Sequence, residues 1–436
     1  MAMQIKDIFS RLYKITFDLF FYTAIIATIL ALLPENLFPT FPLNPNPYSN
    51  EHLFKGLYGH QWNNDLVINA TFIGTSQLYG PESMVSVGEY IYTGLADGRL
   101  VRIHKTTEEI ELVLQFSTLP ECGAGITSKI RQCGRFLGLR HHTDGHLYAI
   151  EASTGLYRID LSQNTKEHIP MEKQSTEPII YNDLVFDPQQ EGLVYITVSS
   201  NRWYLDQIAY SISEHEYTGY VLAFDLNTRK SSIISEGHSL TNGIDITGDK
   251  QSLIFSATNE YAIKKISLEK ARESFTSGTP LSNEHVTTFG RLLPGEPDNI
   301  RIDETNGDIL VGMFTTRPYS KLFRDYLCNW PFVRKALSRT AYSLSLVLDY
   351  IDTNLYQNHA LQQVSFDLYS GHIIYKLLPK RDGAVIKLDG QTGMIKSIHG
   401  SEQFNSISEA IVDQNGDLYF GSFRNVFLGR VVKGKH

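Results

Sequence analysis

The sequence predicts an all-β protein, a six-bladed β-propeller, with an N-terminal transmembrane helix and a partly helical insertion in the fifth blade. Three observations predict the propeller. Short apolar runs occur in pairs bounded by Gly, Asp and Asn, which is the pattern of paired antiparallel strands. The first strands of six pairs recur about every 47 to 59 residues, apart from one interval of about 109 that holds an insertion. Asp-Gly or Asn-Gly dipeptides, which favour tight hairpin turns, accompany the strands.

Length and composition set the limits for every other inference. The chain has 436 residues, of which 42% are hydrophobic, 20% charged and 11% aromatic, as in ordinary globular proteins. A formal net charge of −8 gives no cationic field, so nucleic acid is not an expected partner. Three cysteines without a C-x-x-C pair exclude zinc-finger and thioredoxin-type sites.

The N-terminal region is the first element. Leu19–Leu33 contains no charged residue, and Lys6, Arg11 and Lys14 precede it. We favour a retained signal anchor over a cleaved signal peptide, because the residues before Pro34 make a weak cleavage site. A buried core helix is disfavoured because the segment is apolar on all faces.

This interpretation divides the chain into parts. Residues 1–18 are a cytoplasmic tail, 19–33 the span, 34–75 a proline-rich tether and lead-in, and 76–436 the propeller. The protein is then a single-pass type II membrane protein with its propeller in the secretory lumen or outside the cell. The sequon at Asn69 is a predicted glycosylation site on that side.

The strand pairs follow in order along the propeller. A β-sandwich would space its strands by about 8 to 12 residues without a longer period. The six pairs are 90–93 with 100–103, 147–150 with 156–159, 194–197 with 221–224, 253–256 with 262–266, 309–312 with 384–388, and 418–421 with 427–431. The dipeptides are Asp97-Gly98, Asp144-Gly145, Asn306-Gly307, Asp382-Gly383 and Asn415-Gly416.

The insertion covers about residues 315–381. Apolar side chains from Leu322 to Trp330 recur at helical spacing, with basic residues around them. Three interpretations stay open: a lid that shapes a pocket at the channel mouth, a helix on the membrane surface, and a helix packed on the propeller.

Oxygen-bearing side chains recur at one phase of the repeat, before the strands named first in each pair. Since the innermost strand of each blade faces the central channel, they are expected to converge there. Two carboxylates and three amides without Cys or His suit a hard cation such as Ca²⁺. Alternatively, Asn and Asp are ordinary turn residues. The predicted metal ligands are Glu82, Asn182, Asn242, Asp298 and Asn299.

The cysteines leave two alternatives. Cys122 and Cys133 bracket ten residues, a loop that a disulfide would restrain in an oxidising compartment, or they are two free thiols. Cys328 lies in an aromatic stretch and is expected to pack as a small hydrophobic residue.

Five stretches resemble strictosidine synthase-like proteins, in unbroken order from about Gly80 to Val432. They are 80–83 (GPES), 93–99 (TGLADGR), 133–138 (CGRFLG), 297–301 (PDNIR) and 421–424 (GSFR). The resemblance implies a six-bladed propeller shared with paraoxonase, gluconolactonase and regucalcin, a central calcium ion, and hydrolysis of aryl esters or lactones. It also implies metal ligation by the same five residues and a disulfide between Cys122 and Cys133.

Departures from the family pattern weaken the catalytic expectation. Paraoxonase-like lactonases use two histidines, and the corresponding positions fall near Leu137 and Glu151. Of the adjacent His141 and His142, at most one points toward a channel. The plant synthases use a glutamate where this chain has Ser408, followed by Glu409, which is a candidate acid or base or a hydrogen-bonded structural carboxylate.

Three functional classes remain. The first is a membrane-anchored, calcium-dependent hydrolase of small aryl esters or lactones, in which the metal polarises the carbonyl. The second is a non-catalytic, membrane-anchored propeller that binds a partner or serves as a scaffold. The third is a synthase that condenses an amine with an aldehyde. The sequence identifies neither the substrate nor a protein partner.

Overall fold

The computed structural model describes residues 2–54, 61–63, 65–123, 125, 129–171, 178–290, 293–317, 321–373, 383–404 and 406–435. The chain forms two compact units. We call Met1–Tyr48, Ser213–His215 and Phe323–Leu377 the helical unit. Ser49–Ile212, Glu216–Leu322 and Leu378–His436 form the propeller unit.

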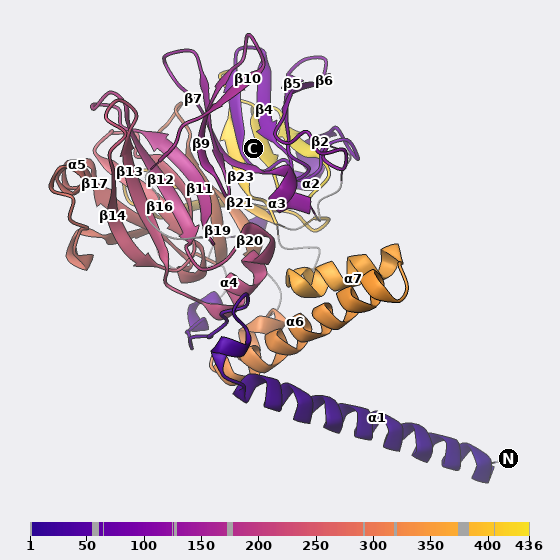
Figure 1. Cartoon of the computed structure of the whole chain (residues 1–436). Helices are drawn as coiled ribbons and strands as arrows, with labels where there is room; N and C mark the ends of the chain where they lie inside the picture. The colour runs from indigo at the N-terminus through magenta and orange to yellow at the C-terminus, as the bar shows by residue number, and fades with distance from the viewer. Residues whose placement is uncertain are drawn as a thin grey trace. The chain divides into compact units, whose positions relative to one another are not determined.

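The propeller unit consists of six sheets, most strands of which pair antiparallel (Figure 1). The first sheet has β3 (Met84–Val87), β4 (Tyr90–Gly94), β5 (Arg99–His104) and β6 (Ile110–Gln115). The second has β7 (Phe136–His141), β8 (Leu147–Glu151), β9 (Gly155–Asp160) and β10 (Thr165–His168). The third has β11 (Ile180–Phe186), β12 (Leu193–Ser200), β13 (Gly219–Asp225) and β14 (Ser231–His238).

The other three sheets repeat this order. The fourth has β15 (Thr241–Ile246), β16 (Ser252–Ala257), β17 (Ala262–Ser267) and β18 (Thr287–Gly290). The fifth has β19 (Gly295–Ile302), β20 (Ile309–Thr316), β21 (Ala384–Leu388) and β22 (Ile395–Gly400), and β1 (Trp62–Asn63) pairs parallel to β22. The sixth has β23 (Glu409–Val412), β24 (Leu418–Gly421), β25 (Leu428–Val431) and, at its edge, β2 (Ala70–Ile73).

The sheets form a closed ring. Their first strands, β3, β7, β11, β15, β19 and β23, contact one another in this order, and β23 contacts β3. A separate cluster of buried apolar side chains fills the space between each two neighbouring sheets. The middle strands β12 and β16 are buried along their whole length, because both faces of the sheet pack against a neighbour. This confirms the predicted all-β propeller.

The predicted strand pairs are present. Each of the six pairs named from the sequence is an antiparallel ladder of the structure. Gly98, Gly145, Gly307 and Gly416 have φ between +78° and +85°, a conformation that glycine adopts without a steric penalty. Asp382 lies outside the described residues. The edge strand β2 lies within residues 34–75, the predicted tether and lead-in.

The helices are α1 (Ala2–Leu32), α2 (Asp65–Asn69), α3 (Ile130–Cys133), α4 (Ile208–Glu214), α5 (Leu268–Ser277), α6 (Pro331–Asn354) and α7 (His359–Tyr369). Tyr13–Leu32 of α1 is long and apolar enough to cross a membrane, and its side chains are almost entirely exposed. The chain between β20 and β21 carries α6 and α7. Residues 323–327 form only a 3-10 turn, and the α-helix begins at Pro331, a favoured first helical residue. Helical spacing from Leu322 therefore predicted the helix several residues too early.

Candidate functional site

The backbone of three innermost strands is interrupted at one equivalent point. Along β11, β15 and β19 the pairing with the second strand shifts, so that two residues lie opposite one. Such bulges change the direction of side chains and are frequent next to functional sites. The residue pairs at the three bulges are Asn182-Asp183, Asn242-Gly243 and Asp298-Asn299. Four of the five predicted metal ligands thus occupy bulges of neighbouring sheets.

Contacts between sheets fix these bulges. The hydroxyl of Thr197, opposite the bulge of β11, donates to the carbonyl oxygen of Asn242. In the same way Ser256, opposite the bulge of β15, donates to the carbonyl oxygen of Asp298 at 2.6 Å. Gly243 allows β15 to approach β19 closely, since a Cβ at this position would lie 2.4 Å from the Cα of Asn299.

All five predicted ligands are buried, with at most 8% of any of them exposed. We call Glu82, Asn182, Asn242, Asp298 and Asn299 the axial site. The side-chain oxygens of Asn182, Asn242 and Asn299 are buried without a hydrogen-bond partner. Such an orphaned acceptor costs free energy unless it meets a donor, a water or a cation. Three amide oxygens in this condition, together with two carboxylates, fit a hard cation.

The two carboxylates of the axial site influence each other. Burial raises the pKa of Glu82, although Arg135, whose Nη2 lies 2.8 Å from a carboxylate oxygen of Glu82, opposes the shift. Burial also raises the pKa of Asp298 well above its usual value, and the negative charge of Glu82 adds to this effect. Two buried carboxylates that repel each other form a site that a cation would stabilise.

The donor atoms of the axial site are all oxygens, without a sulfur or an imidazole nitrogen. Within the described ranges, no group of three or more His, Cys, Asp or Glu side chains is arranged to hold a metal ion. The axial site has only two acidic members, and amides supply its remaining oxygens. The residues present therefore suit Ca²⁺ better than Zn²⁺ or Fe²⁺.

A second polar cluster contains Arg301, Asp183, Glu409 and Ser83. The guanidinium of Arg301 forms ion pairs with Asp183 at 2.7 Å and with Glu409, and donates to the hydroxyl of Ser83 at 3.1 Å. All four side chains are buried. The four residues come from β19, β11, β23 and the segment before β3. The guanidinium of Arg301 therefore connects four sheets.

The carboxylate of Glu409 already has partners in the folded protein. Its carboxylate accepts a 2.6 Å hydrogen bond from the backbone N–H of Met84 as well as the ion pair with Arg301. Burial raises the pKa of Glu409 to about 7, against the opposing charge of Arg301. A role as acid or base would require one of these partners to move away.

Other positions singled out in the sequence have their own contacts. Leu137 is buried and apolar, and Glu151 accepts backbone N–H groups of Arg135, Ser153 and Thr154. His141 is exposed. The amide nitrogen of Asn69 donates to the carbonyl oxygen of Lys435 at 2.9 Å.

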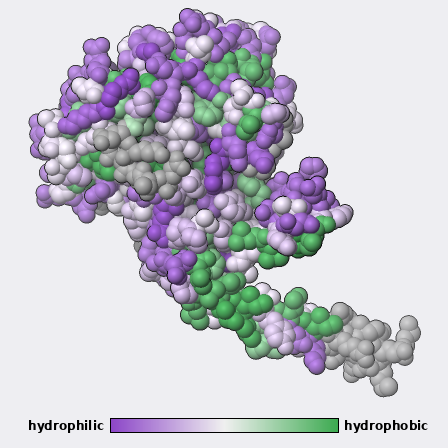
Figure 2. All heavy atoms as spheres, in the orientation of Figure 1, coloured by the Kyte–Doolittle hydropathy of each residue, from purple (hydrophilic) through white to green (hydrophobic). Residues whose placement is uncertain are grey.

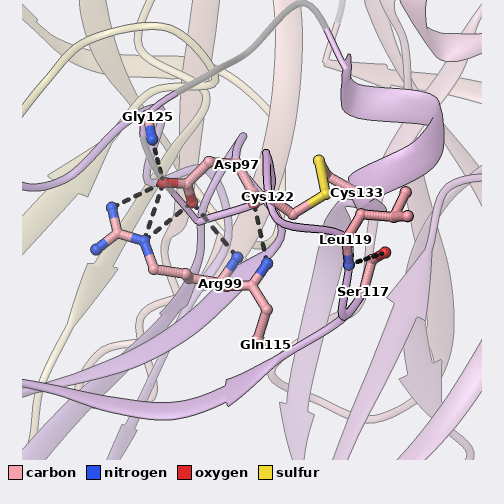
Figure 3. Close-up of a disulfide and its surroundings, with 8 residues drawn as sticks. All are labelled: Asp97, Arg99, Gln115, Ser117, Leu119, Cys122, Gly125 and Cys133. Carbon is pink, nitrogen blue, oxygen red and sulfur yellow. Dashed lines mark hydrogen bonds and ion pairs between the residues drawn. A yellow bond between two sulfur atoms is a disulfide. The ribbon is translucent and has the colours of Figure 1, made fainter.

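Cys122 and Cys133 form a disulfide, as the family resemblance implies (Figure 3). Beside it the buried carboxylate of Asp97 accepts hydrogen bonds from the side chain of Arg99 and from the backbone N–H of Gly125. Cys328 is buried and lies outside the disulfide, as expected.

Sequence reasoning missed Arg301, Asp183 and Arg135. Charged residues inside or beside strands indicate an internal partner, and Asp183 and Arg301 each lie within two residues of a predicted ligand. The partner itself has no local signal, because Asp183 and Arg301 are 118 positions apart.

Comparisons with known proteins concern the family and the fold of the chain. A family model described as strictosidine synthase matches residues 182–270, and a model described as strictosidine synthase-like, N-terminal, matches residues 59–103. Asn182 and Asn242 lie in the first match and Glu82 in the second, whereas Asp298, Asn299 and Glu409 lie outside both.

Individual relatives extend the similarity. Adipocyte plasma membrane-associated protein of Danio rerio is 29% identical over 367 residues, covering 82% of this chain and 77% of its own length. The protein of the same name from Homo sapiens is 26% identical over 435 residues, covering 97% and 90%. A gluconolactonase from Xanthomonas campestris is structurally similar, with a TM-score of 0.50 at 11% identity over 89% of this chain and 94% of its own, which supports the fold alone.

Proposed function

We propose that this chain, a relative of the strictosidine synthase-like proteins, is a membrane-anchored, calcium-dependent hydrolase of aryl esters or lactones. The observation that carries the proposal is the axial site: three buried amide oxygens without a donor, beside two buried carboxylates with raised pKa values. A site designed only for stability would supply donors to these oxygens.

Each residue of the site has a defined task in this proposal. Glu82, Asn182, Asn242, Asp298 and Asn299 would hold the ion, and Thr197 and Ser256 fix the backbones that carry two of the ligands. When bound, calcium supplies a Lewis acid that polarises the carbonyl group of an ester or lactone. A carboxylate at the site would take a proton from the attacking water, and Glu82 or Asp298 could do this only by loosening its hold on the ion.

Glu409 is the remaining proposed acid or base. Its pKa of about 7 suits proton exchange near neutral pH, but Arg301 and Met84 occupy its carboxylate. Turnover that survives in Glu409→Gln at full calcium occupancy would remove Glu409 from the mechanism.

The proposal includes membrane topology. Lys6, Arg11 and Lys14 precede the apolar part of α1, so α1 would be a retained type II signal anchor and the propeller would be lumenal or extracellular. The Cys122–Cys133 disulfide supports an oxidising compartment. A mass shift on glycosidase treatment that disappears in Asn69→Gln would establish this side and the predicted glycan.

The experiment measures turnover and thermal unfolding of the full chain on a panel of aryl esters and lactones, with calcium or a chelator. We expect calcium to raise both the turnover and the Tm, and Asp298→Asn and Asn242→Leu to abolish both effects. Asp160→Asn, at the end of β9 in the second sheet, is the matched control and should respond as the wild type does. Turnover that is independent of calcium would contradict the proposal.

A non-catalytic propeller that binds a partner is the second candidate. It is favoured by Leu137 and Glu151, which stand where related lactonases have histidines and which are either apolar or fully hydrogen-bonded. The same experiment separates the two candidates, because a binding propeller would show calcium-raised Tm without turnover of any substrate.

A further inference from the structure

The helix α6 exposes apolar side chains along its whole length. Seven uncharged residues at spacings of three and four follow one face, and each of them is exposed or half-exposed. We call this face the α6 stripe. It consists of Val333, Leu337, Thr340, Leu344, Val347, Leu348 and Ile351. A surface helix of a soluble protein normally turns such a face toward the core.

The opposite face of α6 is buried, and it is mostly polar. Its buried residues are Arg334, Ala336, Ser338, Arg339, Tyr342, Ser345 and Asp352. Asp352 accepts from the backbone N–H of Asn358 at 2.7 Å and from the side chain of Gln362 at 2.9 Å, which holds α7 against α6. The helix is therefore amphipathic in the reverse sense, with mostly polar residues inside and apolar residues outside.

The N-terminal half of α6 is joined to the end of α1. Arg339 donates to the carbonyl oxygens of Leu30 at 3.0 Å and Leu33 at 2.6 Å, groups that the end of a helix leaves without partners. Its guanidinium also lies over the ring of Phe38 at 4.4 Å. The point where an apolar helix would leave a bilayer is therefore in contact with α6, within the same compact unit.

Exposed aromatic side chains lie at both ends of α6. Tyr326 and Trp330 precede it, Phe332 lies in its first turn, and Tyr356 follows it; all four are exposed. Tyr and Trp are enriched where protein meets the headgroup region of a membrane. Figure 2 shows hydrophobic atoms along one side of the α6–α7 hairpin as well as on α1.

From these observations we propose that the α6 stripe lies in the membrane interface, with lipid as its partner. The stripe carries no charge for a complementary protein surface, and the helix that bears it is joined through Arg339 to the end of the helix that would enter the bilayer. An apolar face at the acyl boundary and a polar face toward protein is the arrangement of an interfacial helix. This inference rests on α1 entering a membrane.

The test uses the full chain in phosphatidylcholine vesicles. An environment-sensitive fluorophore is attached at Val347→Cys, and a nitroxide-bearing lipid serves as the quencher. We expect blue-shifted emission and loss of intensity at position 347. Met394→Cys, an exposed apolar position of the propeller unit, is the matched control and should show neither effect. Wild-type chain, with Cys328 buried, gives the background labelling.

Further variants make the outcomes distinct. A fluorophore at Phe20→Cys, an exposed position of α1, reports membrane entry separately. Quenching at position 20 without quenching at 347 overturns the proposal and leaves the anchor intact; quenching at neither overturns both. A signal at 347 that vanishes when the protein is diluted in lipid assigns the stripe to a second copy and overturns the proposal. Leu344→Glu should abolish quenching at 347, whereas Leu112→Glu, an exposed leucine of the first sheet, should not.

Discussion

A buried histidine, His238, makes the stability of the protein depend on pH. His238 lies at the end of β14, where its Nε2 is 2.6 Å from the hydroxyl of Ser235 and its ring contacts Phe255 edge-on. Burial lowers the pKa of His238 from 6.5 to about 4, although the charge of Glu260 opposes the shift. The folded protein therefore binds this proton less readily than the unfolded chain.

We predict that the contribution of His238 to the free energy of unfolding falls as the pH drops from about 6.5 to about 4, whereas the raised pKa of Glu409 acts in the opposite sense. The contribution of His238 is fully present above pH 6.5 and is lost as the pH falls through the folded pKa, at up to ~1.4 kcal/mol for each pH unit. Urea unfolding at a series of pH values measures the slope. His238→Gln should reduce it, while His168→Gln, an exposed histidine of β10, should leave it unchanged. Equal slopes for wild type and His238→Gln would refute the assignment.

At the scale of elements, the Arg301 cluster joins strands that are far apart in the sequence. Removal of the guanidinium leaves Glu409 buried without its cation and leaves Asp183 with only the longer, 3.5 Å ion pair to Arg140. Breaking a buried ion pair in this way costs about 3 to 5 kcal/mol, whereas exposed pairs contribute about 0 to 1 kcal/mol.

The prediction is that Arg301→Met lowers the free energy of unfolding by about 3 to 5 kcal/mol. Arg158→Met, which removes the exposed ion pair of Arg158 with Glu167, is the control and should change it by less than about 1 kcal/mol. Denaturant unfolding of both variants provides the comparison. Similar losses in the two would mean that Arg301 is not a structural connector.

The elements also explain what sequence can and cannot reveal. Most of the strand pairs and their glycine turns were predictable because the pairing partners are near in sequence, and the fifth pair, which α6 and α7 separate, because it continues the repeat. The positions of the axial-site residues could be inferred from the sequence because they recur at one phase of a repeat, and their role as metal ligands stays a prediction. The role of Arg301 was not predictable from the sequence, because its partners come from other sheets. Strands β1 and β2 were not, since each has at most four residues and pairs with a strand more than 300 positions later.

At the scale of the whole molecule, the ring is closed by the N-terminal part of the chain. Strand β2 pairs with β25 at the edge of the sixth sheet, from Ala70 opposite Val431 to Ile73 opposite Leu428. Ile73 is also a member of the apolar cluster between the first and sixth sheets. Both ends of the propeller therefore meet in one sheet, and the ring depends on residues that precede its first complete sheet.

This closure predicts a sharp difference between two truncations. A chain that begins at Pro34, which lacks only α1, should unfold cooperatively with a Tm close to that of the full chain. A chain that begins at Ser76 lacks the buried Phe41, Leu43 and Leu53 as well as β1, α2 and β2. It exposes the edge of β25 and the apolar groups that Ile73 and Leu66 cover. We expect it to aggregate or to melt at a markedly lower temperature.

Ile73→Asp in the full chain should reproduce the defect without shortening the chain, because it places an unpaired charge in the same cluster. Calorimetry and light scattering measure both effects, and a chain from Ser76 as stable as the chain from Pro34 would show that the ring closes without β2.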